Sequence, residues 1–260
     1  MPQRSVRWGE LRAPELRALA EEDATVVVPV ASIEQHGPHL PTMTDTLLGT
    51  SVACAAAERL VAAGRPCVVT SPVWSGLSEH HMAFGATLSV DVETFGALLG
   101  GVVGSLKRHG FRRVLLLNSH GGNIAALRAV VDSLAPAHPE LRLVTATYWH
   151  LAADLVDPLL ETQRSIRHAG EAETSLVLAL RPELVDEAAL TAAACPDPRD
   201  GREGREEDAY RWQSFAERTP SGALGDPRAA TAEKGRELLD RLAGRLAERL
   251  VDPAFWGEPR

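Results

Sequence analysis

Hydrophobic residues gather in four short runs, separated by longer segments in which apolar residues recur periodically. The runs TVVVPV, PCVVTSPV, RVLLLN and LRLVTATY lie at 25–30, 66–73, 113–118 and 141–148. Such near-continuous apolar runs are typical of strands buried on both faces of a parallel sheet. The pattern predicts helices at 46–63, 92–109 and 123–135, each followed by a Gly or Pro that ends a helix. Strands that alternate with helices predict an α/β fold with a mostly parallel sheet.

Two segments near the C-terminus break this alternation. The stretch at about 196–221 is polar, charged and rich in Pro and Gly. It is either a solvated loop or a surface excursion that contacts another subunit or closes over a site. The segment that follows, GDPRAATAEKGRELLDRLAGRLAERL, predicts a terminal helix with Asp226 as its N-cap and Pro227 in its first turn.

Composition and charge indicate the class of protein and argue against some classes of partner. The chain has 260 residues, 45% hydrophobic and 24% charged, which predicts a soluble protein with a single α/β domain over 1–260. A formal net charge of −8 argues against nucleic acid and anionic membranes as partners. No apolar run is long enough to span a bilayer, and no secretory leader is evident. The three cysteines form no CxxC pair, so we expect neither a thiolate zinc site nor a disulfide framework, and a cytoplasmic location.

Chemically active side chains follow the first predicted strand, in the stretch SIEQHGPHLPTMTD at 32–45. Glu34 and His36 are two residues apart, so on an extended segment they point to one side. In open parallel sheets, sites form beyond the carboxyl ends of the strands. Asp45 lies at the start of the next helix, where its carboxylate either caps the backbone amides or joins the other two in a cation site.

Three other places gather polar groups. In LNSHGGN at 117–123, His120 directly follows a strand, and two glycines allow close approach of a ligand. In HAGEAETS at 168–175, His168 precedes a helix whose first turn carries two acids, and acids stabilise that end of a helix. We expect Glu171 to meet solvent and Glu173 to be buried, where it needs a partner such as a cation. The loop GLSEHHMAFGATLSV at 76–90 is either a polar loop or a wall that faces the substrate.

Together, these motifs resemble the creatininase (creatinine amidohydrolase) family. The pieces EQHGPHLP…TD, GLSEHHMAF…TLS, NSHGGN, HAGEAETS and GALGDPRAAT stand in family order over about 25–245. The resemblance implies a three-layer α/β/α sandwich, a homo-oligomer that is often a hexamer, and two divalent metal ions per chain, Zn, Mn or Fe. It implies that Glu34 and His120 bind one metal, that His36 binds the other and that Asp45 bridges both. His168 resembles the family's proton-transfer histidine.

Two departures from the family pattern concern the metal and the substrate. Gly122 stands where creatininase proper has a metal-binding glutamate, and we expect Glu173 to replace it. Arg164 stands where creatininase has a tryptophan that holds creatinine, so creatinine is a doubtful substrate, although Trp149 matches another pocket aromatic. The HGGN variety is similar to relatives that act on formamides, on peptides in the mycofactocin system, or on other small ring compounds. The residues predicted to face the substrate are Ser78, Glu79, His80, Gly121, Trp149 and Arg164.

The predicted activity is hydrolysis of a C–N amide bond in a small cyclic amide, a formamide or a short peptide. Two-metal sites lower the pKa of a bound water and polarise a carbonyl group. His168 would take the proton of the water and deliver it to the leaving nitrogen. Two alternatives stay open: a non-catalytic ligand-binding or assembly protein on the same scaffold, and a metal-dependent C–C hydrolase or lyase.

Overall fold

A four-stranded parallel sheet forms the centre of the computed structural model, which describes residues 5–196 and 210–257. The order of its strands is β2-β1-β3-β4, and they cover Thr25–Val30 (β1), Cys67–Val69 (β2), Arg113–Asn118 (β3) and Arg142–Thr147 (β4). The predicted strands are therefore present, but β2 is shorter than the run at 66–73. Pro72 has no N–H to donate to a ladder, and Val73 meets Val30 only through an isolated bridge.

A helix precedes the first strand, and the others lie between and after the strands. In chain order they are α1 (Ala13–Glu21), α2 (Thr44–Ala62), α3 (Val92–Arg108), α4 (Ile124–Ala137), α5 (Tyr148–Leu151), α6 (Ala153–Val156), α7 (Glu171–Leu180), α8 (Leu190–Ala193) and α9 (Ala232–Val251). The three helices predicted between the strands are confirmed to within two residues at each end. Pro136 does not end the third of them, because α4 continues through it to Ala137.

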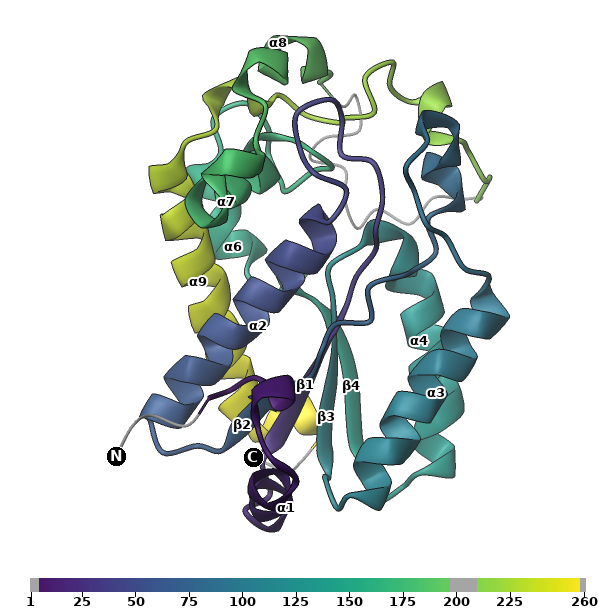
Figure 1. Ribbon diagram of the computed structural model, residues 1–260, viewed down its shortest axis with the longest axis vertical. Coiled ribbons are helices and arrows are strands. Elements are labelled where there is room, and N and C mark those ends of the chain that lie inside the picture. Colours follow the sequence, from purple (N-terminus) through teal and green to yellow (C-terminus); the bar gives the residue numbers. More distant parts are fainter. Residues whose placement is uncertain (1–4, 197–209, 258–260) are drawn as a thin grey trace.

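Helices cover both faces of the sheet, so the predicted three-layer α/β/α architecture is confirmed (Figure 1). Successive strand residues point to opposite faces. Val27 and Leu115 pack into an apolar cluster with side chains of α2, α7 and α9. Their neighbours Val26 and Leu116 pack into a second cluster with side chains of α1, α3 and α4. Within 5–196 and 210–257, the helices lack the combination of length and hydropathy that a membrane span needs.

The terminal helix begins later than the sequence predicts. The helix α9 starts at Ala232, and the side chain of Thr231 caps it by accepting a hydrogen bond from the backbone N–H of Lys234. Asp226 instead caps a separate 3-10 turn, Pro227–Ala229, through the backbone N–H of Arg228. Asp226 as the N-cap of the terminal helix is therefore wrong, since Ala230 is extended and separates the two elements.

The polar stretch at 196–221 lies partly outside the described residues, which omit 197–209. Its second half folds over the carboxyl end of the sheet and includes a short 3-10 helix, Phe215–Glu217. Phe215 is 3% exposed, and its ring lies 4.1 Å from that of His81, centroid to centroid. Phe215 thus packs on the histidines described next, whereas Tyr210 and Trp212 of the same half are exposed.

Candidate metal centre

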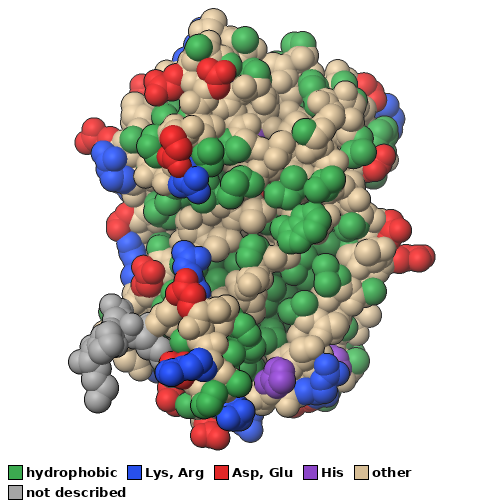
Figure 2. Space-filling view, viewed as in Figure 1, with side chains coloured by type: hydrophobic (Ala, Val, Ile, Leu, Met, Phe, Trp, Pro, Cys, Tyr) green, Lys and Arg blue, Asp and Glu red, His purple; other side chains and the backbone are tan. Residues whose placement is uncertain are grey.

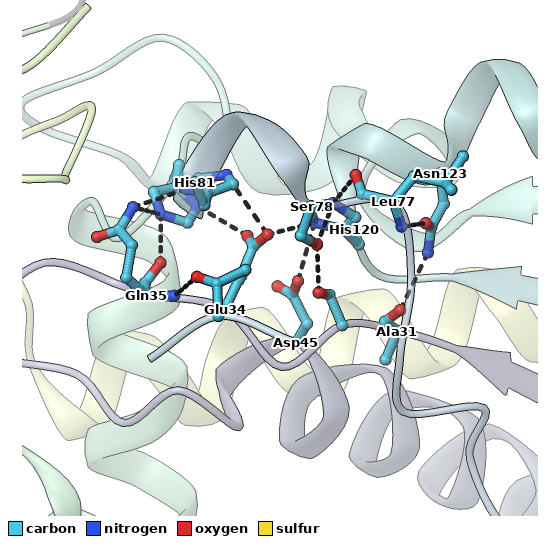
Figure 3. Close-up of polar contacts among 12 residues, drawn as sticks. Ala31, Glu34, Gln35, Asp45, Leu77, Ser78, His81, His120 and Asn123 are labelled. Carbon is cyan, nitrogen blue, oxygen red and sulfur yellow. Dashed lines mark hydrogen bonds and ion pairs between the residues drawn. The ribbon is translucent and has the colours of Figure 1, made fainter. Parts of the chain in front are cut away.

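Five side chains meet beyond the carboxyl edge of the sheet. Glu34 and His36 follow β1, His120 follows β3, Asp45 lies in the first turn of α2, and Glu173 lies in the first turn of α7. Figure 3 shows Glu34, Asp45 and His120 pointing toward one another. All five are buried, with exposed fractions between 0% and 6%. Three carboxylates and two imidazoles out of water require a partner of positive charge.

Backbone carbonyls fix which nitrogen of each imidazole faces the carboxylates. Nδ1 of His36 lies 3.1 Å from the carbonyl oxygen of Glu34, and Nε2 of His120 lies 3.1 Å from that of Leu77. A carbonyl only accepts, so these two nitrogens carry the hydrogens. The opposite nitrogens are bare in the neutral rings: Nε2 of His36 and Nδ1 of His120. Histidines that bind metals are held in this way by a partner on the other nitrogen.

The bare nitrogens point at carboxylate oxygens. Nε2 of His36 lies 3.2 Å from Oδ1 of Asp45, and Nδ1 of His120 lies 3.1 Å from both Oδ2 of Asp45 and Oε2 of Glu34. Nε2 of His36, Oδ2 of Asp45 and Oε2 of Glu34 have no partner that meets the geometry of a hydrogen bond. Lone pairs that face one another at these distances repel, so a proton or a cation must lie between them.

The pKa values of these side chains also indicate that the centre binds positive charge. Burial alone would lower the pKa of His36, but the Asp45 carboxylate outweighs it and raises the pKa to about 9. Burial likewise opposes the positive charge of His120, yet Glu34 and Asp45 raise its pKa well above the usual value. Burial raises the pKa of Glu173 to about 7. The pocket therefore attracts positive charge, which is the condition for binding a cation in place of protons.

The five side chains form two groups of three that share Asp45. One group is Glu34, Asp45 and His120, and the other is His36, Asp45 and Glu173; in each, the potential ligand atoms lie within 4.8 Å of one another. Mixed carboxylate and imidazole donors suit Zn, Mn or Fe. The residues present therefore fit two metal ions, with Asp45 placed to serve both.

His168 lies beside this centre, and Gln35 holds it. The side-chain amide nitrogen of Gln35 lies 2.7 Å from Nδ1 of His81 and donates at 2.9 Å to the carbonyl of Gly222, which accounts for both amide hydrogens. Nε2 of His168 lies 2.9 Å from the backbone carbonyl of Gln35. A carbonyl only accepts, so this nitrogen is the donor in that contact. The bare Nδ1 of His168 faces Oε1 of Glu34 at 3.4 Å. Burial and the neighbouring His36 lower the pKa of His168 well below its usual value, so the ring is neutral.

Gly122 cannot carry a side chain in this backbone conformation. A Cβ atom there would lie 2.2 Å from the carbonyl oxygen of Leu77 and 2.5 Å from Nε2 of His120. The glycine thus permits the contact between Leu77 and His120 that fixes the His120 ring. A carboxylate for the His36 group has to come from another element, and Glu173 lies 3.8 Å from Nε2 of His36.

The expectation that Glu171 meets solvent is wrong. Glu171 is 0% exposed, and its carboxylate forms an ion pair with Lys234 of α9. It also accepts hydrogen bonds from the backbone of Glu161, at 3.0 Å, and of Thr162, at 2.8 Å. The tertiary fold explains this burial. Helix α9 brings the ammonium group of Lys234 against the start of α7, so the carboxylate of Glu171 is paired without solvent. Glu171 belongs to neither of the two groups of potential ligands.

The residues predicted to face the substrate separate into two sets. Ser78 is buried and lies 3.1 Å from Nε2 of His120, and His80 stacks on the His120 ring at 5.7 Å. Gly121 is exposed at the same turn. The structure does not bring the other three residues next to His120. Glu79 is exposed, Trp149 packs against the apolar cluster of α2, α7 and α9, and Arg164 is exposed at a surface hollow formed by 157–164.

The sequence indicates no role for Gln35 or Phe215, and it places His81 only within the loop at 76–90, which is either a polar loop or a wall that faces the substrate. His81 is 2% exposed, and its Nε2 lies 3.4 Å from Oε2 of Glu34. The adjacent histidines in SEHHMAF signalled this residue. Nothing local distinguishes Phe215, which lies in a polar stretch and reaches the site only through the tertiary fold.

Comparisons with known proteins agree with this geometry. The family model described as creatininase, creatinine amidohydrolase, matches residues 9–250. The chain is 31% identical to a mycofactocin precursor peptide peptidase of Mycobacterium ulcerans, over 94% of this chain and 93% of the relative. It is 32% identical to a creatinine amidohydrolase of Pseudomonas putida, over 95% and 96%. A solved structure described as creatininase Mn superposes with a TM-score of 0.81 at 27% identity, covering 95% of this chain and 98% of the other.

Proposed function

The chain belongs to the creatininase family and is a hydrolase that acts on C–N bonds, and we propose that it uses two divalent metal ions to do so. The observation that carries the proposal is the pair of bare imidazole nitrogens, on His36 and His120, that face carboxylate oxygens at 3.1–3.2 Å. Glu34, Asp45 and His120 would hold one ion, and His36, Asp45 and Glu173 the other. When bound, such ions supply Lewis acidity and a water of lowered pKa.

Side chains around the metal ligands would carry out the other steps of the reaction. His168 presents a neutral, bare Nδ1 toward Glu34, so it can accept a proton from the attacking water and pass it to the leaving nitrogen. Gln35 and His81 keep this ring and the Glu34 carboxylate in place. Phe215 packs on the rings of His81 and His168 and excludes water from that side.

We assign the substrate as a small cyclic amide, a formamide or a short peptide. The names of the relatives support a peptide and a small cyclic amide, with nearly equal identities. Creatinine itself is disfavoured, because the family position of the tryptophan that holds creatinine carries Arg164, which is exposed at the hollow formed by 157–164 and offers no flat apolar wall. Turnover of creatinine at an ordinary enzymatic rate, about 1–1,000 per second, would contradict this assignment.

A substrate screen tests the proposal. Metal-free protein reconstituted with Zn²⁺, Mn²⁺ or Fe²⁺ is incubated with cyclic amides, formamides and short peptides, and the release of amine is measured. We expect hydrolysis of one class only with metal present. Metal-bound protein that cleaves none of them would favour the non-catalytic alternative. Product analysis would reveal the other alternative, a C–C hydrolase or lyase that uses the same metals.

We further propose a cytoplasmic homo-oligomer, with the hexamer of the family as the expected size. The three free cysteines, of which Cys54 and Cys67 are buried, suit a reducing compartment. Large apolar side chains are exposed between 74 and 98, and hydrophobic groups gather on the face shown in Figure 2. These exposed residues are Trp74, Met82, Leu88, Val92 and Leu98. Light scattering coupled to size-exclusion chromatography measures the mass directly, and a monomer would contradict the proposal.

A further inference from the structure

The phenolic hydroxyl of Tyr148 is buried without a hydrogen-bond partner among the described residues. The residue is 2% exposed, and its ring packs edge-on against Trp149 at 5.0 Å. Leaving a buried hydroxyl unpaired costs about 1–3 kcal/mol, and such groups in native proteins normally have a partner. Glu34, His36 and Asp45, the three potential metal ligands with unpaired atoms, show the same signature. Nδ1 of His39 and Oγ1 of Thr50 share it outside the ligand groups, so the position of Tyr148 has to decide what its hydroxyl meets.

The position of Tyr148 in the sheet places it at the same edge as these ligands. It directly follows β4, as the His120 turn directly follows β3, and the last residues of the two strands, Asn118 and Thr147, are paired in register. The side-chain amide of Asn118 donates to Thr147 Oγ1 at 3.1 Å and to the carbonyl of His120 at 2.9 Å. One amide thus connects the backbone before Tyr148 to the turn that presents His120.

Packing places Tyr148 beside the helices that carry two of these ligands, because Tyr148 belongs to the apolar cluster that includes residues of α2 and α7. Burial, and then the negative charges of Glu173 and Asp45, raise the pKa of Tyr148 well above its usual value of 10. The phenol is therefore protonated near neutral pH and can act as a donor. Glu173 and Asp45 are two of the three side chains in the group with His36, yet neither accepts a hydrogen bond from Tyr148.

We propose that Tyr148 is a further catalytic residue, whose hydroxyl donates a hydrogen bond to the carbonyl oxygen of a substrate bound at the His36–Asp45–Glu173 group. This inference rests on the proposed function. A donor preorganised in a buried site stabilises negative charge that develops on such an oxygen. Such a donor role also explains why a tyrosine, rather than a phenylalanine, occupies this buried position, where the described residues offer no acceptor.

Binding of a small oxygen ligand tests the donor. Acetohydroxamate presents a carbonyl and an anionic oxygen, and it is titrated calorimetrically into zinc-loaded wild type, Tyr148→Phe and Tyr210→Phe. Tyr148→Phe should weaken acetohydroxamate binding by roughly 10–100-fold, because a hydrogen bond to a charged oxygen is lost. Zinc content and thermal stability should not fall, because the variant removes only an unpaired hydroxyl. Tyr210, which is 84% exposed, serves as the matched control and should bind like wild type.

A spectroscopic measurement separates this role from a structural one. The chain has two tyrosines, so protein labelled with 3-fluorotyrosine gives two ¹⁹F resonances, one from buried Tyr148 and one from exposed Tyr210. The Tyr148 resonance should shift when acetohydroxamate is added to the zinc-loaded protein, while the Tyr210 resonance stays in place.

An unshifted Tyr148 resonance, or equal acetohydroxamate affinity in wild type and Tyr148→Phe, would overturn the inference. A zinc-loaded wild type that does not bind acetohydroxamate would overturn it as well. A wild type that binds no zinc would instead overturn the proposed function, so the two failures are distinguishable.

Discussion

The carboxylate of Glu173 accepts a hydrogen bond of 2.6 Å from the backbone N–H of Ala169. The same oxygen, Oε2, lies 3.8 Å from Nε2 of His36. Ala169 has a φ of 53°, a left-handed conformation that residues with a side chain rarely adopt. Because Ala169 directly follows His168, Glu173 links the second candidate metal group to the turn that presents the histidine proposed to transfer protons.

Glu173→Gln should remove one of the two metal ions and abolish hydrolysis. A glutamine keeps an acceptor for Ala169, so the turn is preserved while the negative charge is lost. Elemental analysis of wild type and variant gives the ion count, and Glu171→Gln, two residues away, should keep both ions. A Glu173→Gln protein that retains two ions per chain would show that Glu173 is not a ligand. Weakened binding alone would not establish ligation, because neighbours of ligands also change metal affinity, by about 10–100-fold.

Glu171→Gln should instead reduce stability, by roughly 1–3 kcal/mol at neutral pH, since it breaks a buried pair with Lys234. Burial opposes ionisation of Glu171, but the Lys234 and Thr162 contacts outweigh it and lower its pKa below the usual 4.5. A carboxyl whose pKa is lower in the folded state stabilises the fold above its unfolded pKa. That contribution is lost as the pH falls through the folded pKa.

Denaturant titrations at several pH values check this prediction. The difference between wild type and Glu171→Gln should be full at neutral pH and should shrink as the pH falls below about 4.5. Glu183→Gln is the matched control, because the pair of Glu183 with Arg181 is exposed and should contribute little. A difference between wild type and Glu171→Gln that does not change with pH would contradict the ion-pair explanation.

Asp45→Ala should lose both metal ions, because its carboxylate belongs to both groups of potential ligands. Asp132→Ala, which removes an exposed carboxylate from α4, should keep both and controls for a general loss of acidic charge. Metal content after dialysis measures the outcome. Retention of one ion in Asp45→Ala would mean that Asp45 serves a single site.

His168→Ala should lower the hydrolytic rate by about 10²–10⁴, the usual contribution of a general acid–base group, with the metal content unchanged. Its Nδ1 faces Glu34, so an alternative role as a metal ligand is geometrically open. Parallel assays of rate and metal content separate the two roles. Loss of an ion together with activity would assign His168 to the ligands.

The sequence predicts the strands and the helices between them well, because both depend on local periodicity. The apolar runs and the Gly and Pro that follow each helix are local signals, and the rule that sites form at carboxyl ends of parallel strands located Glu34 and His120. For Asp45 the sequence left a helix cap and a cation site open, and Glu173 was expected to be buried because it leads into the apolar face of its helix.

The remaining features depend on contacts that no residue pattern encodes, most of them between segments far apart in the chain. Glu171 is buried because Lys234, 63 residues later, pairs with it. Phe215 reaches the histidines from a stretch whose composition predicts a surface excursion. The tautomers of His36 and His120 depend on backbone carbonyls of Glu34 and Leu77, and no residue pattern encodes those contacts.

The most direct test of the account is anomalous diffraction from crystals of the zinc-loaded protein. We expect two peaks per chain, one among Glu34, Asp45 and His120 and the other among His36, Asp45 and Glu173. A carboxylate oxygen of Asp45 should lie within about 2.0–2.2 Å of each ion, and one of Glu173 within the same distance of the second. A single peak, no peak, or a second ion without Glu173 among its ligands would contradict the account.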